Sequence, residues 1–158
     1  MRKLIVAAGL VACMALTACG KSVSQAEANA PPPAKKSLAR QAQFYQGQDN
    51  VQAVQSATVT VAKGGGLDLA AKATTDGAGW TRVGFLPRIY AATPPDGIYE
   101  VDVVAEKPAA PGAAGPTPVE VKSAWDKYKD GRVKGVKFIS KTNEVVAMVP
   151  ASGAAAAK

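Results

Sequence analysis

Two short stretches decide the fold class: Ala57-Thr58-Val59-Thr60-Val61 and Tyr99-Glu100-Val101-Asp102-Val103. In both, apolar and polar residues alternate with a period of two, the pattern of a half-buried strand with one face on a core and one in water. A turn signal lies beside each, with three glycines at 64–66 after the first and Pro94-Pro95-Asp96-Gly97 before the second. The sequence therefore predicts at least two amphipathic strands.

Strand-forming residues also dominate the C-terminal part of the chain. Residues 133–139 and 144–149 are rich in β-branched residues, and 140–143 between them predict a hairpin turn. Weaker strand patterns occupy 67–74 and 80–83, and a helix stays open for the former because it is rich in alanine. We therefore expect five or six strands.

Only two segments, 37–46 and 121–129, have apolar residues at helical spacing, and the second suits a strand equally well. The connection 107–118 contains four prolines and is predicted to be an exposed mobile loop. The prediction is a mainly β protein with at most one or two short helices. It would form a single small antiparallel β-sandwich or partly open barrel over residues 39–150.

The N-terminus has the pattern of a secretory signal. Arg2 and Lys3 precede an apolar stretch of twelve residues, 4–15, which is too short to span a bilayer because a spanning helix needs about 20. Leu16-Thr17-Ala18-Cys19 follows, and it resembles the lipobox of bacterial lipoproteins. The resemblance implies a signal peptide over 1–18 and a covalent lipid, such as palmitate, on Cys19.

Other processing patterns remain open. Leu10-Val11-Ala12-Cys13 also fits the lipobox, but it leaves only six residues of the apolar stretch before it. Ordinary signal-peptidase cleavage has candidate sites at Ala26-Glu27-Ala28 and Ala28-Asn29-Ala30, and an uncleaved anchor is the third alternative. In the lipoprotein family an Asp after the lipidated Cys favours inner-membrane retention. Gly20 at this position implies an outer-membrane lipoprotein facing the periplasm.

The ends of the mature chain are predicted to be disordered. Residues 19–38 are rich in proline and alanine, and the triple proline 31–33 favours an extended chain that cannot start a packed unit. This segment reads as a tether between the lipid and the domain. Residues 151–158, mostly alanine, read as a disordered tail.

Composition excludes several kinds of chemistry. The chain has no histidine, and its two cysteines, Cys13 and Cys19, lie within the first nineteen residues. The folded part therefore has no His base, His ligand or thiolate site. No serine-hydrolase, phosphate-loop or dinucleotide motif is present. We expect no catalytic residues, no metal and no cofactor apart from the lipid, and a non-enzymatic protein, although an unrecognised hydrolase stays open.

The carboxylates are the remaining source of chemistry. Glu100, Asp102 and Glu106 share one face of the strand predicted over 98–106, and Asp96 lies just before it. These oxygens could bind Ca²⁺ or form a glycosidase-type pair. Alternating acids on a strand are more typical of its solvated face, and this is the interpretation we favour.

Positive charge is concentrated in the C-terminal part, where residues 107–158 contain nine basic and four acidic residues. The candidate binding residues combine this basic patch at 122–141 with three aromatic residues: Lys122, Lys127, Lys129, Arg132, Lys134, Lys137, Lys141, Trp80, Phe85 and Trp125. The alternative for the lysines is a solvated face that discourages strand pairing, and for the aromatic residues a place in the core.

These patterns predict a membrane-anchored periplasmic lipoprotein whose β domain binds a protein partner, as an accessory subunit of an envelope complex or as an immunity factor. Binding of an anionic envelope polymer or lipid through the basic patch is the alternative. Nucleic acid is not an expected partner, because an exported protein rarely meets it.

Overall fold

The structure is a computed structural model and describes residues 37–151. The predicted signal peptide, Cys19 and most of the tether lie outside these residues. Within them the chain forms ten strands and no α-helix. They are β1 (Ala39–Arg40), β2 (Gln48–Asn50), β3 (Ala53–Val61), β4 (Leu67–Gly77), β5 (Thr81–Pro87), β6 (Ile89–Tyr90), β7 (Ile98–Glu106), β8 (Ala114–Trp125), β9 (Gly135–Ile139) and β10 (Glu144–Met148).

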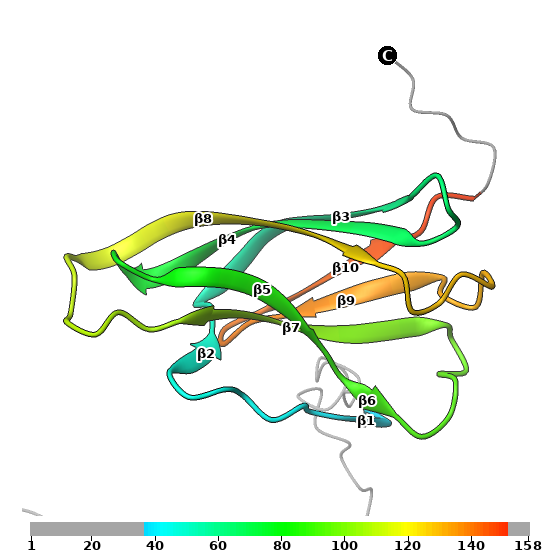
Figure 1. Cartoon of the computed structure of the whole chain (residues 1–158), viewed down its shortest axis with the longest axis horizontal. Helices are drawn as coiled ribbons and strands as arrows, with labels where there is room; N and C mark the ends of the chain where they lie inside the picture. The colour runs from blue at the N-terminus through cyan, green and yellow to red at the C-terminus, as the bar shows by residue number, and fades with distance from the viewer. Residues whose placement is uncertain (1–36, 152–158) are drawn as a thin grey trace, which may run out of the picture. The chain divides into compact units, whose positions relative to one another are not determined.

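The strands form an unclosed sandwich, which confirms the mainly β prediction. A three-stranded sheet, β3-β4-β8, packs over a five-stranded sheet that contains β10, β9, β7, β2 and β5 (Figure 1). The short β1–β6 ribbon lies below the five-stranded sheet in that view. No helix within residues 37–151 is long and apolar enough to cross a membrane.

β7 is the centre of the five-stranded sheet. It pairs with β5 on one edge, and on the other it pairs first with β9 and then with β2. The β7–β9 pair is parallel, with Ile98 opposite Gly135, so one pair departs from the antiparallel arrangement that the sequence predicts. The turn signal before β7 is confirmed at Gly97, which has a φ of +69° that favours glycine.

The core fills the space between the two sheets. From β7 it receives Tyr99, Val101, Val103 and Ala105, and the centre of the packing around them contains the fully buried Phe138 of β9. The edge-on contacts of Tyr99 with Trp125 and of Phe85 with Phe138 add aromatic packing. The alternating pattern therefore places its apolar residues on the inner face, as predicted.

Two local predictions are wrong, and one open choice is decided. Residues 37–46 contain the two-residue strand β1 and no helix. The strand alternative is confirmed at the start of 121–129, where 121–125 end β8 and 126–129 have no regular structure. The loop predicted over 107–118 is shorter, because β8 begins at Ala114. Prolines are tolerated there because β8 is an edge strand, where an N–H is not needed on the unpaired side.

One corner of the sandwich is held by the turn between β9 and β10. Asn143, in the turn between β9 and β10, accepts a hydrogen bond from the Val54 N–H at 2.9 Å and donates one to the Val54 carbonyl at 2.7 Å. The backbone N–H groups of Lys141 and Thr142 donate to the carbonyls of Val51 and Gln52. The starts of β3 and β10 are thus held together, although the two strands do not pair.

Candidate binding cleft

A hollow opens at the other end of β3 and β10. This end cleft has a volume of about 510 Å³ and is lined by the β3–β4 turn, the segment 126–134 and the chain after β10. Figure 1 shows the β3–β4 turn at its right. Its apolar lining residues are Val61, Leu67, Tyr128, Val133, Met148 and Val149. A volume of this size is within the range of ligand-binding clefts.

Two apolar side chains that line the cleft are exposed to solvent. Val61 follows the inward-facing Val59 on the same side of β3, yet its side chain is 47% exposed. Met148 at the end of β10 is 58% exposed. Gly135, its partner on β9, leaves it room, because an added Cβ would lie 2.9 Å from the Met148 sulfur. Two large apolar side chains therefore face solvent inside one hollow.

The rim of the cleft is basic. Lys129 and Lys134 are among its lining residues. The Lys134 ammonium donates to the Gly131 carbonyl at 3.2 Å and pairs with no carboxylate of the described residues, whereas Lys129 lies 3.5 Å from Asp126. Lys127 and Arg132 each lie 5.5 Å from the centre of the Tyr128 ring, which is itself in the lining. Cation–π contacts of this kind hold the rim cations close to the apolar lining.

The structure divides the predicted basic patch. Four of its seven cations gather in segment 126–134: Lys127, Lys129, Arg132 and Lys134. Lys122 is on the outer face of β8. Lys137 lies 3.3 Å from Glu100 and 3.4 Å from Glu144, and Lys141 lies 3.0 Å from Asp49. The residues 122–141 are therefore not one continuous basic surface.

The three aromatic candidates belong mostly to the packing of the domain. Trp125 is buried in the core, and Phe85 is half-buried against Phe138. Trp80 is half-buried before β5, with the Lys141 ammonium 5.4 Å from its ring centre. Trp125 is therefore not an exposed anchor, whereas Trp80 and Phe85 each keep part of their surface free.

The prediction of a solvated acidic face on β7 is wrong. Glu100 is 6% exposed and Asp102 is fully buried. Arg88 binds Asp102 through Nε at 2.9 Å and Nη2 at 3.0 Å, and it binds Glu100 through Nη1 at 3.1 Å. Ser37 donates to Glu100 at 2.7 Å and the Gln41 amide approaches Asp102 at 3.5 Å. The segment before β2 thus covers this face.

This buried network behaves as structure. The hydrogen bond with Asp102 raises the pKa of Arg88 above its ordinary value. Burial lowers the pKa of Lys137, but its hydrogen bond and attraction to Glu100 outweigh burial and raise it. Burial, together with the nearby Glu100, raises the pKa of Tyr90 to about 12. The two buried carboxylates are matched by two cations, Arg88 and Lys137, which offsets the cost of burying their charge.

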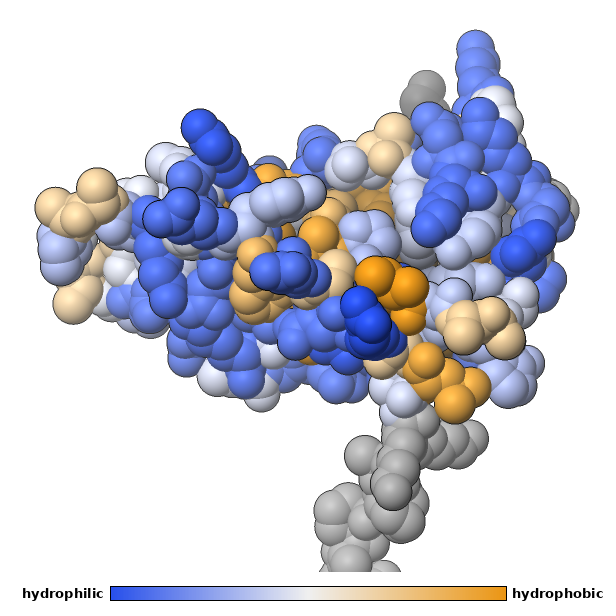
Figure 2. Space-filling model, turned by 60° about the horizontal axis from the view of Figure 1, so that its bottom comes forward, coloured by the Kyte–Doolittle hydropathy of each residue, from blue (hydrophilic) through white to orange (hydrophobic). Residues whose placement is uncertain are grey.

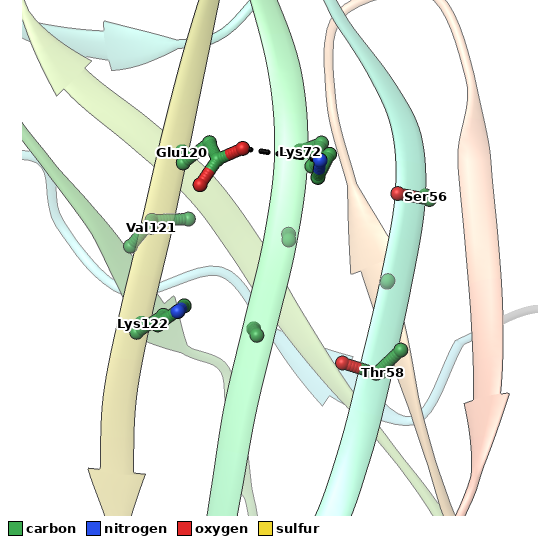
Figure 3. A pocket seen from close by; sticks show the side chains of 9 residues that line it. Ser56, Thr58, Lys72, Glu120, Val121 and Lys122 are labelled. Atoms are coloured by element: carbon green, nitrogen blue, oxygen red, sulfur yellow. Dashed lines mark ion pairs between the residues drawn. The ribbon is translucent and has the colours of Figure 1, made fainter. Parts of the chain in front are cut away.

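Two other surfaces are less suited to binding. A hollow of about 330 Å³ crosses the outer face of the three-stranded sheet, where Ser56, Thr58 and the exposed Lys72–Glu120 ion pair surround it (Figure 3). Small and polar side chains of this kind are typical of a solvated sheet face. On the side that Figure 2 presents, apolar residues form small patches separated by hydrophilic ones.

No protein-family model, curated protein or solved structure shows significant similarity to this chain. Residues 37–151 contain no group of three or more Asp, Glu, His or Cys side chains placed to hold a metal ion. The geometry of the end cleft is therefore the support for its assignment as a binding site.

The sequence does not indicate the apolar part of the cleft. Its patterns predict Val61 in a strand and Met148 in a hairpin, and neither pattern points to a binding residue. One signal was present: residues 145–149 read Val-Val-Ala-Met-Val without the polar alternation of the other strands. An edge strand with apolar residues on both faces exposes some of them.

Proposed function

We propose that this protein is a lipid-anchored envelope lipoprotein, held by Cys19 in the outer membrane and facing the periplasm, whose β domain binds a protein partner in the end cleft. The observation that supports binding is the coincidence of exposed Val61 and Met148 with a basic rim in one cleft. An apolar hollow with a polar rim is typical of protein interaction sites. The role is non-enzymatic, either in an envelope complex or as an immunity factor.

Binding of an anionic polymer or lipid through the whole basic patch has less support. A polyanion favours a continuous run of free cations. Here Lys137 and Lys141 are engaged by Glu100, Glu144 and Asp49, and Lys122 lies apart from the 126–134 segment.

Anchoring is tested by fractionation of cells. Cys19→Ser should abolish incorporation of labelled palmitate and release the protein from the membrane fraction, whereas Cys13→Ser should leave both unchanged. Equal palmitate incorporation in the two variants would contradict lipidation at Cys19.

Partner binding is tested by capture from envelope extracts with two variants of β10. Met148→Ser removes an apolar side chain from the cleft, and Val146→Ser removes one of similar exposure, 48%, from the same strand outside the cleft. We expect Met148→Ser to lose capture of a defined partner and Val146→Ser to keep it. Equal behaviour of the two variants would reject the cleft as the site.

A further inference from the structure

The backbone at the cleft has unused hydrogen-bonding groups. The Ala62 N–H donates to the Gly66 carbonyl at 2.9 Å, toward the β4 side. Because successive residues of a strand point their backbone groups in opposite directions, the N–H and C=O of Val61 point away from β4. Among the described strands β3 pairs only with β4. Val61 therefore offers a free donor and acceptor on the cleft side.

β10 presents the same arrangement. The Val149 N–H donates to the Lys134 carbonyl at 2.9 Å, toward the β9 side. By alternation the backbone groups of Met148 point away from β9, and β10 pairs with no other strand of the described domain. Both residues line the end cleft. Two strand edges thus end in one apolar hollow with their hydrogen-bonding groups available.

The edge of β10 lacks the protection that other edges of this domain carry. β8 has Pro116, Pro118 and several charged residues, and β5 has a bulge between Thr81 and Gly84. From 145 to 149 β10 has neither a proline nor a charge. Native proteins usually block free edges with these devices, because an open edge is a template for another strand.

We propose that the end cleft binds an extended segment of the partner protein, which adds to the edge of β10 through the backbone of Met148. An apolar side chain of the segment enters the hollow beside Val61, and acidic side chains meet Lys129 and Lys134. Main-chain hydrogen bonds provide affinity in this mode, and the alternate side chains provide selectivity. The inference rests on the proposed function and names the chemistry of its partner.

Charge complementarity selects this occupant over a second copy of the chain. Pairing β10 with the β10 of another copy would bring two copies of Lys134 toward one interface, and Lys134 pairs with no carboxylate of the described residues. Like charges across an interface disfavour association. An acidic segment instead neutralises the rim cations.

The test uses a synthetic nonapeptide of alternating valine and glutamate. We expect it to bind the domain and to shift the backbone amide resonances of Val61 and Met148. Methylation of alternate peptide nitrogens should weaken binding at least about tenfold, because one or two main-chain hydrogen bonds are lost. Replacement of glutamate by lysine should weaken it by a similar factor, because the charge pairing is lost. Binding that is insensitive to N-methylation would overturn strand addition.

Variants of the protein give an independent measurement. Lys134→Gln should weaken peptide binding in a salt-dependent manner, while Lys122→Gln, on the outer face, should not. Met148→Pro removes a free N–H on an edge, which such positions tolerate, and should weaken binding more than Met148→Leu. Melting curves check that each variant is folded.

The remaining outcomes separate the two proposals. Anionic phospholipid vesicles that shift the same amides when the peptide does not would overturn the peptide assignment. So would a concentration-dependent dimer that Met148→Pro abolishes. If the peptide does not bind but partner capture still depends on Met148, the strand-addition proposal is rejected and the proposed function stands. If partner capture is also independent of Met148, the proposed function fails with it.

Discussion

The side-chain amide of Asn143 binds both backbone groups of Val54, at 2.9 Å to the N–H and 2.7 Å to the carbonyl. It takes the place of a strand residue where β3 and β10 approach without pairing. Ser140 Oγ lies 2.6 Å from Asn143 Oδ1 and completes the arrangement. This side chain therefore links the edges of two sheets, next to the hydrogen bonds from Lys141 and Thr142 to the same strand start.

Asn143→Asp should destabilise the domain although it keeps the shape of the side chain. Aspartate cannot donate to the Val54 carbonyl, so a part-buried acceptor loses its partner at a cost of about 1–3 kcal/mol. Urea denaturation of the two proteins measures the difference in free energy of unfolding. Thr142→Ala, which removes a single exposed hydrogen bond to Gln52, is the control and should cost less.

Arg88→Met should be the most destabilising substitution among the ion pairs. It leaves Glu100 and Asp102 buried without their main cation, and loss of one partner of a buried pair costs about 3–5 kcal/mol. The matched control is Arg82→Met, whose side chain is 83% exposed beside Glu106. An exposed pair of this kind contributes little. Equal loss of unfolding free energy in both variants would contradict a structural role for the buried network.

Acid should weaken the contact between β2 and the two loops beside it. Asp49 lies 2.7 Å from Lys107 and 3.0 Å from Lys141. Burial raises the pKa of Asp49, but hydrogen bonds from these lysines outweigh burial and lower it below 3.8. The stabilisation is therefore complete above the unfolded pKa of about 3.9 and is lost as the pH falls through the folded value.

Asp49→Asn tests this dependence. The wild type should lose more stability between pH 5 and pH 3 than the variant, by about 1 kcal/mol at most, because the pair is partly exposed. Unfolding curves at the two pH values measure it. Parallel losses in the two proteins would assign the acid sensitivity to other carboxylates.

The folded domain should begin close to residue 37. A chain that starts at Ser37 keeps the hydrogen bond to Glu100, and its melting temperature should equal that of the chain starting at Gly20. A chain that starts at Ala42 also loses β1 and the Gln41 contact with Asp102. We expect it to lose about 1–3 kcal/mol of unfolding free energy. A large loss already at Ser37 would show that the tether packs on the domain.

The sequence predicts the strands well but not what covers them. Alternation identifies β7, because Val101 and Val103 face the core whatever lies on the other side. The same alternation cannot reveal that Glu100 and Asp102 are buried, because their partners come from Arg88 and from the irregular segment at 37–41. A polar face that is ion-paired and one that is solvated have the same local pattern.

The end cleft cannot be predicted from local sequence patterns, for a different reason. Val61, Tyr128 and Met148 are far apart in the sequence, and only the tertiary packing brings them to one cleft. The composition indicates the basic residues of its rim. It does not indicate that Lys137 and Lys141 are separate from them, because the acidic partners of those two lysines lie on β7 and β2.

The parallel pairing of β7 with β9 determines when this domain can fold. Parallel neighbours cannot be joined by a tight hairpin. Ile98 can therefore pair with Gly135 only after the ribosome has added the whole of β8 and the start of β9. Contacts between distant parts of a chain make folding slow. The most buried aromatic residue, Phe138, belongs to this late strand. A nascent chain therefore stays without its central packing until nearly all of the domain has been synthesised.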